Sequence, residues 1–422
     1  MRLRDELSDI FVQGRYQMMV GVSLAILLPM LIRTFLTGME LSSPYQVNTA
    51  IGSTIALIGG YGSFRRIHVL PGITSGGYIA TSFTIWFGLL ATVLFLLRLE
   101  YTTIHFTINY VITMAFFLFV HLFFVSRRKI AMGVVPSPST EALPPLGRVE
   151  WHYIASPDIS IPRLNAVVVD LHASHSDEWS ARIAGFALEG IPVYHVKDTI
   201  ENLTGAVAIG QLSENTLGSL NPNHLYFALK AAIDGILAAA ALVVLIPLFL
   251  VVALAIRLES PGAALFRQQR TGFRKRPFTV YKFRTMVTAQ SSQPTDRISA
   301  ITQDRDPRIT RLGAVLRKFR IDELPQLINV LRGEMSLIGP RPEVVALTQW
   351  YEREIPFYHY RHIIKPGITG WAQINQGHVS AVDDVIHKLH LDFYYIKHFS
   401  FWLDVLILLK TIRTMCVGHG AK

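Results

Sequence analysis

The sequence is poor in cysteine and in charged residues. Its 422 residues include one cysteine, Cys416, which excludes an intramolecular disulfide framework and a cysteine-rich zinc or iron–sulfur site. Charged residues make up 17% of the chain, against about 25% in an ordinary soluble protein. Together with a mean hydropathy of +0.35, this shortage indicates that part of the chain lies in lipid. The composition therefore excludes a small secreted scaffold and a disordered tail.

The common nucleotide-binding patterns are also missing. No G-x-G-x-x-G follows a predicted strand, and no P-loop sequence occurs. Lys and Arg outnumber Asp and Glu by 40 to 30, which gives a net charge of +10, but no RNA- or DNA-binding motif accompanies this charge. Cytoplasmic loops, anionic lipid and an acidic substrate explain the basic balance. We therefore expect a membrane partner and no nucleic acid.

Long apolar runs are what the first 130 residues do contain. Four of them approach the roughly 20 residues that a helix needs to cross the hydrocarbon: Met18–Phe35, Val47–Phe64, Tyr78–Leu97 and Ile104–Val125. The second run is the weakest, because glycines loosen it. Basic residues cluster before the first run, after the second and after the fourth, which places both ends of the module in the cytoplasm. We predict a four-helix transmembrane module over residues 1–130.

A short soluble block follows the membrane module. A linker rich in Pro, Ser and Gly is expected over residues 131–150, and a small Rossmann-like α/β domain without a cofactor motif over residues 151–222. The expected strands are 151–155, 166–171 and 191–196, and the expected helix is 177–188. An interaction or regulatory role fits this domain better than a nucleotide site.

A fifth apolar segment, residues 236–256, is not expected to span the membrane. It carries no charge and contains Pro247 near its middle. A fifth crossing would export the basic stretch that follows, and such a stretch resists translocation. Pro247 can break the helix, so we predict a re-entrant hairpin that enters and leaves one leaflet. The following domain would then lie at the bilayer surface, within the catalytic domain expected over residues 223–422.

Many residues suited to binding an anionic substrate follow residue 260. Residues 278–284 alternate like a strand, and Lys282 and Arg284 on one face could clamp a diphosphate. Asp322 is expected to cap a helix, where the dipole favours its ionised form. Asp322 could attack phosphorus while Glu323 holds a divalent metal. As pattern alone, a capping Asp followed by Glu is common and leaves a structural role open.

Several ordered motifs together resemble the bacterial sugar transferase family, the monotopic phosphoglycosyl transferases that act on undecaprenyl phosphate. They are K-F-R-T-M at 282–286, D-P-R-I-T-R-L-G at 306–313, L-R at 316–317, D-E-L-P-Q-L at 322–327, N-V-L at 329–331, M-S-L-I-G-P-R-P at 335–342, K-P-G-I-T-G-W-A-Q at 365–373 and D-F-Y-Y at 392–395. The resemblance covers residues 230 to about 414, and the whole chain is similar to the long form of the family.

The resemblance implies a two-step exchange. Asp322 would attack the sugar-proximal phosphate of a UDP-sugar and expel UMP, and undecaprenyl phosphate would then take the phosphosugar from the aspartyl intermediate. Glu323, with Asp322, is associated with Mg²⁺ in this scheme. The residues expected at the phosphates are Lys282, Arg308, Arg311, Arg317 and Arg341, and those expected at the nucleotide are Thr369, Gly370 and Gln373.

The expected fold is thus a membrane α-helical N-terminal bundle, a small Rossmann-like middle domain and a mixed α/β catalytic domain with a re-entrant membrane helix. The expected location is the bacterial inner membrane, with the catalytic domain facing the cytoplasm. The expected pathway is exopolysaccharide, capsule or O-antigen assembly. Glucose and galactose are the favoured sugars from family habit, and a homo-oligomer is compatible with the sequence. The alternative is a non-catalytic membrane scaffold that recruits assembly proteins; a transporter is disfavoured because the four runs lack acidic residues.

Overall fold

The computed structural model of the chain describes residues 13–38, 40–68, 77–125, 129–141, 143–146, 149–159, 164–208, 222, 224–287, 308–376 and 382–417. Asp306 and Pro307 of the predicted motifs lie outside these residues. The chain divides into two compact units, Met1–Thr204 and Gly205–Lys422, and each is described by itself.

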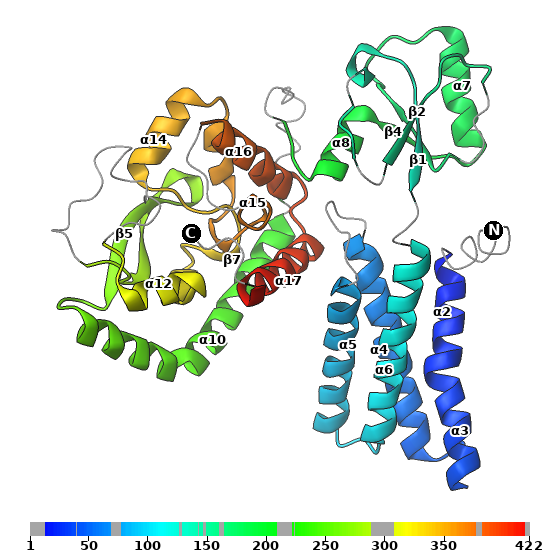
Figure 1. The fold of residues 1–422 in the computed structure, drawn as a ribbon, viewed down its shortest axis with the longest axis horizontal. Helices are drawn as coiled ribbons and strands as arrows, with labels where there is room; N and C mark the ends of the chain where they lie inside the picture. The colour runs from blue at the N-terminus through cyan, green and yellow to red at the C-terminus, as the bar shows by residue number, and fades with distance from the viewer. Residues whose placement is uncertain are drawn as a thin grey trace. The chain divides into compact units, whose positions relative to one another are not determined.

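The N-terminal unit begins with four helical rods (Figure 1). The first runs through α2 (Gly14–Val22), a π-helical turn (Ser23–Leu27) and α3 (Leu28–Thr37); the others are α4 (Pro44–His68), α5 (Gly77–Leu96) and α6 (Thr103–Val120), which η2 (His121–Val125) continues. The segments Gly14–Thr37, Ile79–Leu96 and Thr103–Phe124 are long and apolar enough to cross a membrane. The four predicted runs are therefore helical, and three of them have the length and hydropathy of a span.

Helix α4 differs from the others because it presents small and polar residues to its neighbours. The hydroxyl of Ser63 accepts a hydrogen bond from Trp86 Nε1 at 2.8 Å. A Cβ atom added at Gly59 or Gly60 would lie 2.4–2.5 Å from the rings of Trp86 and Phe83. The glycines that were expected to weaken this membrane span therefore let aromatic rings approach the backbone, as close packing of membrane helices requires.

Pro29 interrupts the backbone hydrogen bonds of the first rod, and a side chain of a neighbouring helix replaces the missing donor. Because proline lacks an N–H group, the carbonyl of Ala25, four residues earlier and within the π-helical turn, loses its α-helical donor. With its amide oriented toward that carbonyl, Asn109 of α6 donates to Ala25 O at 2.9 Å and accepts from Ser53 Oγ of α4 at 2.9 Å. One buried amide therefore ties three rods together.

The second part of the N-terminal unit is a four-stranded parallel sheet of order β2-β1-β3-β4. Its strands are β1 (Ile130–Val134), β2 (Val149–Tyr153), β3 (Ala166–Val169) and β4 (Val193–His195), with helices α7 (Asp177–Leu188) and α8 (Val196–Thr204). Successive residues of β3 alternate between two cores: Val167 and Val169 pack with Phe186 of α7, and Val168 packs with Val196 of α8. The three predicted strands and the helix are present. Strand β1, next to the centre of the sheet, was not predicted, because its residues fall where the linker was expected.

The C-terminal unit combines one long helix with short strands and helices. Its elements in order are α10 (His224–Glu259), β5 (Leu265–Thr271), η5 (Phe273–Lys275), β6 (Pro277–Phe283), α12 (Arg311–Lys318), η6 (Ile321–Gln326), α13 (Leu327–Leu331), β7 (Ser336–Ile338), α14 (Val345–Glu354), η7 (Tyr358–Ile363), β8 (Gly367–Thr369), α15 (Trp371–Asn375), α16 (Val382–Lys397) and α17 (Phe401–Val417). Strands β5 and β6 pair antiparallel, and β7 and β8 pair parallel.

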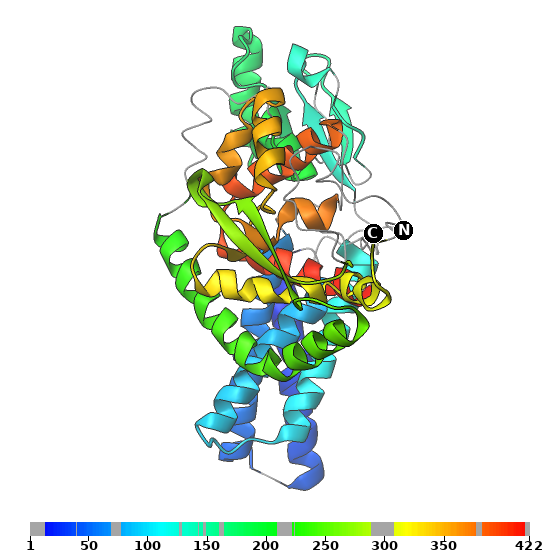
Figure 2. The ribbon, with the colours of Figure 1, turned by 90° about the vertical axis from the view of Figure 1, so that its left-hand side faces the viewer.

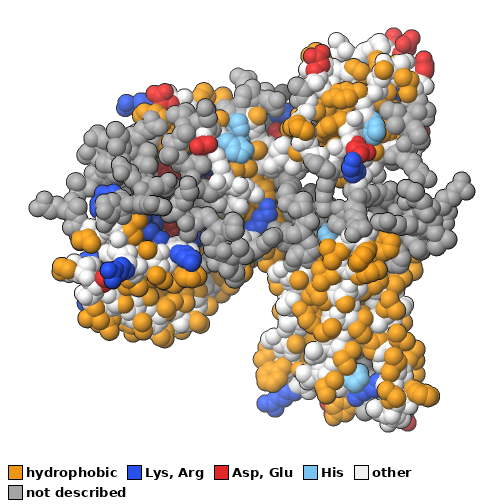
Figure 3. All heavy atoms as spheres, in the orientation of Figure 1, with side chains coloured by type: hydrophobic (Ala, Val, Ile, Leu, Met, Phe, Trp, Pro, Cys, Tyr) orange, Lys and Arg blue, Asp and Glu red, His pale blue; other side chains and the backbone are white. Residues whose placement is uncertain are grey.

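Helix α10 contains the apolar segment 236–256 and starts twelve residues before it. It is long and apolar enough to cross a membrane, remains helical through Pro247, and changes direction along its length (Figures 1 and 2). Hydrophobic side chains cover its outer surface (Figure 3), among them Val244 at 76% exposure and Leu250 at 67%. Such a surface suits lipid.

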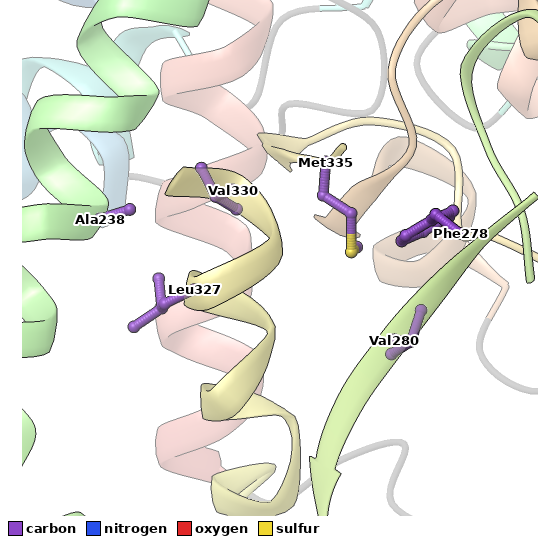
Figure 4. Close-up of a cluster of buried hydrophobic side chains, with 6 residues drawn as sticks. All are labelled: Ala238, Phe278, Val280, Leu327, Val330 and Met335. Atoms are coloured by element: carbon purple, nitrogen blue, oxygen red, sulfur yellow. The ribbon is translucent and has the colours of Figure 1, made fainter. Parts of the chain in front are cut away.

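The first turns of α10, in contrast to its apolar part, are held by a buried ion pair and a hydrogen bond. Lys230 Nζ lies 2.8 Å from the Asp404 carboxylate of α17, and the Ser336 hydroxyl at the beginning of β7 donates to Asp234 Oδ2 at 2.5 Å. A buried hydrophobic cluster continues this contact, with Ala238 of α10, Leu327 and Val330 of α13, and Phe278 and Val280 of β6 around Met335 (Figure 4). The apolar helix is thereby joined to the strands that carry the site.

Candidate active site

The Asp-Glu pair lies on a short helix with an unusual start. Asp322 and Glu323 belong to η6, and Arg320 before it has φ 54° and ψ 23°, a left-handed conformation that few non-glycine residues adopt. Strain of this kind is common at functional sites. The prediction that Asp322 caps a helix is wrong, because η6 begins at Ile321. The following helix, α13, ends shortly before Gly333, which has φ 72° and whose N–H donates to Val330 O at 2.9 Å.

Three cations converge on Glu323. Its Oε1 accepts from Lys282 Nζ at 3.0 Å and from Arg341 Nη2 at 2.7 Å, and its Oε2 lies 3.6 Å from Arg320 Nη1. These groups come from β6, from the segment after β7 and from the turn before η6, so folding collects them from 60 residues of chain. Only 6% of Glu323 is exposed, so the carboxylate exchanges hydration for ion pairs.

Asp322 lies beside this cluster, and its carboxylate takes no part in the ion pairs of Glu323. It is 8% exposed, and among the described residues no hydrogen bond or ion pair to its side chain is found. Burial raises the pKa of Asp322, and so does the neighbouring Glu323 carboxylate, while Lys282 and Arg341 act against them. A carboxylate that is buried, unpaired and next to cations has the properties of a nucleophile for an anionic electrophile.

The surrounding cations also shift the pKa values of Glu323 and Lys282. Burial alone would raise the pKa of Glu323, but Arg341 and Lys282 outweigh it and hold that pKa well below its usual range. Burial lowers the pKa of Lys282 to about 8, and Arg341 adds to this effect although Glu323 opposes it. At neutral pH the centre therefore holds an ionised glutamate and a lysine close to its titration point.

Of the other predicted phosphate-binding residues, Arg317 is near the centre. Its Nε donates to Thr285 Oγ1 at 2.9 Å, and its charge acts on Asp322. Arg308 and Arg311 are exposed; Arg308 joins the backbone of Val287, and Arg311 begins α12. Among the described residues, the charge of Arg311 acts on the Glu259 carboxylate at the end of α10.

Arg284 does not form the predicted clamp with Lys282. It follows the last residue of β6, is 7% exposed, and donates from Nη2 to Ser260 O at 2.6 Å and from Nη1 to Pro261 O at 2.8 Å. Arg284 therefore binds the turn that ends α10. The interpretation of the two cations as one diphosphate clamp is wrong, because the guanidinium of Arg284 is used to bind the Ser260–Pro261 turn.

The three predicted nucleotide residues lie along one edge of the segment that carries Arg341. The carbonyl of Thr369 accepts from Gly339 N at 2.9 Å, and a Cβ atom at Gly370 would lie 2.2 Å from Gly339 O. Gln373 donates from Nε2 to Ile368 O at 3.3 Å, and its Oε1 is buried without a hydrogen-bond partner. In the part of the chain that the structure describes, no hydrogen bond joins these three residues to Asp322 or Glu323.

Two cations of the site were not predicted. Arg320 stands directly before the Ile-Asp-Glu sequence, three residues from Glu323, a spacing that places side chains on one side of a helical turn. Arg270 lies on β5 and, with Arg341, acts on the Lys282 ammonium. The spacing of Arg320 from Glu323 is visible in the sequence, whereas Arg270 reaches the Arg341 segment through its contacts with Pro342 and Val344, which no local pattern contains.

The pair of adjacent carboxylates fits a magnesium ion by chemistry. Mg²⁺ is commonly bound through one or two carboxylates together with substrate phosphates, and Asp322 and Glu323 would hold it here. The described residues include no group of three or more His, Cys, Asp or Glu side chains suited to a metal. Since Lys282 and Arg341 already contact Glu323 Oε1, these cations would have to move to the phosphates.

Two buried carboxylates with cations around one of them are groups suited to a phosphate-bearing substrate. The bacterial sugar transferase family model matches residues 225–418. The chain belongs to this family and is a transferase enzyme.

Individual relatives extend the similarity. The chain is 42% identical over 405 residues to the UDP-N-acetylgalactosamine-undecaprenyl-phosphate N-acetylgalactosaminephosphotransferase of Aeromonas hydrophila, covering 96% of this chain and 95% of that protein. It is 41% identical over 195 residues to the UDP-glucose:undecaprenyl-phosphate glucose-1-phosphate transferase of Escherichia coli, covering 46% of this chain and 41% of that one. It is also 41% identical over 191 residues to an exopolysaccharide production protein of Rhizobium leguminosarum, of which it covers 93%.

Proposed function

We propose that this protein transfers a sugar 1-phosphate from a UDP-sugar to undecaprenyl phosphate through a covalent aspartyl intermediate. The observation that carries the proposal is the buried Asp322, which has no hydrogen-bond or ion-pair partner among the described residues and lies beside Glu323, which binds Lys282 and Arg341. The names of the relatives support the acceptor and the class of donor. The reaction would begin the assembly of an exported polysaccharide.

In the first step an oxygen of Asp322 attacks the sugar-proximal phosphorus of the UDP-sugar. A bond from that oxygen to phosphorus forms while the bond from phosphorus to the bridging oxygen breaks, and UMP leaves with the electron pair. Lys282 and Arg341 turn from Glu323 to the diphosphate and neutralise its charge, and Arg317 adds a third cation. Preorganised charge of this kind is the main protein contribution to phosphoryl transfer.

In the second step an oxygen of undecaprenyl phosphate attacks the same phosphorus. The bond to Asp322 breaks, the aspartate returns as a carboxylate, and undecaprenyl diphosphosugar is formed. Mg²⁺, when bound at the two carboxylates, would neutralise phosphate charge. No proton has to be supplied in either step, since both nucleophiles are anions and both leaving groups depart as anions.

Helix α10 is the segment of the catalytic unit that would lie in the membrane. Its curvature, its exposed apolar surface and the internal Pro247 support a re-entrant helix in the inner leaflet of the bacterial inner membrane, with the catalytic unit on the cytoplasmic side. A lipid-borne phosphate would then meet Asp322 at the bilayer surface. The strand order β2-β1-β3-β4 is the beginning of the flavodoxin-like order, which supports a doubly wound fold of the Rossmann-like class for the middle domain.

The nucleophile is tested with Asp322→Asn. We expect the rate of UMP release from a UDP-sugar, in membranes with undecaprenyl phosphate and Mg²⁺, to fall on the order of 10³-fold or more, as when other covalent nucleophiles are removed. Asp384→Asn, which changes an exposed carboxylate on α16, is the matched control and should keep full activity. Turnover of Asp322→Asn at the normal rate would rule out the assignment.

The donor is tested separately with a panel of UDP-sugars. UDP-glucose and UDP-galactose represent the sequence-based expectation, and UDP-N-acetylgalactosamine represents the relative that matches almost the full chain. One donor is expected to release UMP much faster than the others. If none of a broad panel releases UMP from the wild-type protein, the proposed function is wrong.

A further inference from the structure

The segment Pro340–Glu343 carries Arg341 and has few means of holding itself in place. Two of its four residues are prolines, which have no N–H group to donate to a strand or a turn. Its carbonyl oxygens nevertheless need donors, because Pro340 and Pro342 are buried. The position of Arg341 therefore depends on donors from elsewhere in the unit.

All four carbonyls of this segment are paired. Pro340 O accepts from Gly367 N at 2.9 Å, and Glu343 O accepts from Thr271 N at 2.9 Å, so the ends are held by backbone groups. The two carbonyls in the middle are bound by side chains: Arg361 Nη2 donates to Arg341 O at 2.9 Å, and Arg270 Nη1 donates to Pro342 O at 2.5 Å. Two guanidinium groups thus hold the backbone on either side of the Arg341–Pro342 peptide bond.

Arg361 is itself rigidly placed. It is 3% exposed, and besides Arg341 O it donates to Asp392 Oδ2 at 2.8 Å and to the hydroxyl of Tyr358 at 2.6 Å. Asp392 belongs to α16 and Tyr358 to η7, so Arg361 connects the Arg341 backbone to two elements that do not reach Asp322. Arg270 is fixed on its own strand by two hydrogen bonds to Gln268 Oε1, at 3.1 and 2.9 Å.

At position 270 the use of arginine has an electrostatic cost, because burial and the nearby Arg341 cation lower the pKa of Arg270 to about 10. A neutral amide or hydroxyl could donate to the Pro342 carbonyl without this cost. Arg361, by contrast, is neutralised by the buried carboxylate of Asp392. Guanidinium groups present several rigid donors at once, which suits a role in fixing orientation.

We propose that Arg361 and Arg270 are positioning residues that aim the Arg341 guanidinium at the donor phosphates by binding the backbone carbonyls of Arg341 and Pro342. This inference rests on the proposed function. Neither residue touches the reacting atoms. Because a small displacement of a group that stabilises the transition state can cost on the order of 10²-fold in rate, their effect should appear in kcat more than in KM.

A double-mutant cycle on Arg361 and Arg341 tests the inference. Arg361→Lys keeps a cation for Asp392 but cannot reach Asp392, Tyr358 and Arg341 O together. We expect about 10- to 100-fold lower kcat for UMP release, with KM for the UDP-sugar within about threefold of wild type. In an Arg341→Gln background the same change should have almost no effect, because residues that act through each other are not additive.

The controls separate positioning from folding. Lys275→Gln removes an exposed ion pair with Glu352 in the same unit and should leave kcat unchanged. Arg270→Lys is the second variant: it should lower kcat without lowering the thermal unfolding midpoint, and should also lose its effect in the Arg341→Gln background. If the effects of both lysine variants persist in the Arg341→Gln background, the positioning role is wrong. UMP release by the wild-type protein would in that case still support the proposed function. A wild-type protein that releases no UMP would overturn both.

Discussion

The charge of Lys282, which contacts Glu323, changes at a pH slightly above neutrality. Burial and the nearby Arg341 lower its pKa to about 8, so the ammonium loses its charge as the pH rises through that value. If the charge is needed at the phosphates, kcat/KM should fall about tenfold per pH unit above pH 8. The pH–rate profile of UMP release measures this limb.

Two lysine variants provide the comparison for that profile. Lys282→Arg keeps a charge over the whole range and should move the alkaline limb to higher pH, whatever it does to the maximal rate. Lys318→Arg, at an exposed position of α12, should leave the limb in place. An unchanged limb in Lys282→Arg would assign the alkaline decline to another group.

The sequence places residues relative to one another where a short motif holds them, and not where folding brings them together. Asp322 and Glu323 are adjacent in the chain, so their proximity needs no fold. Arg270 was missed because it reaches the Arg341 segment through contacts with Pro342 and Val344, more than 70 residues away. Arg284 was misplaced because an alternation pattern does not show that its guanidinium donates to the turn after α10.

Among the elements, the first rod and its neighbours allow a test of membrane-helix packing. Asn109 satisfies the Ala25 carbonyl that Pro29 leaves open. Asn109→Leu should lower the free energy of unfolding in micelles by about 1 kcal/mol, the order measured for hydrogen bonds between membrane helices. Thr107→Leu on the exposed side of α6 is the control, and equal stability of the two variants would contradict the role of Asn109.

Elements were predictable in proportion to the length of their pattern. The apolar runs of the first rod, α5, α6 and α10 are long enough to be recognised from hydropathy alone. Strand β1 is five residues long and contains Gly133, so its sequence resembled a linker; only parallel pairing with β2 and β3 makes it a strand. Short strands depend on their partners, which a linear pattern does not contain.

At the scale of the whole molecule, the contacts that build the site lie within one unit. The partners of Glu323 and the donors to the Arg341 segment all fall in Gly205–Lys422, and the Rhizobium relative is matched over 93% of its length by 191 residues of similarity. We therefore expect residues 205–422, expressed alone in membranes, to release UMP within about tenfold of the full chain.

The measurement is UMP release per mole of membrane-bound protein, with the Asp322→Asn form of the same segment as the blank. Loss of more than a hundredfold with normal expression would show that residues 1–204 contribute to the reaction itself. The order of the motifs predicts where the catalytic unit lies. Gly205, the first residue of the compact C-terminal unit, accepts a hydrogen bond from Trp371 Nε1, a contact that no local sequence pattern contains.

The ring of cations around Glu323 has one more consequence. In the resting protein the carboxylate behaves as a tethered competitor for Lys282 and Arg341, present at the high effective concentration of a covalently linked ligand. An incoming anion must displace it, and a monovalent contact such as that of inorganic phosphate is at a disadvantage against a ligand that offers two phosphates at once. We expect this internal competition to keep abundant free phosphate from occupying the centre.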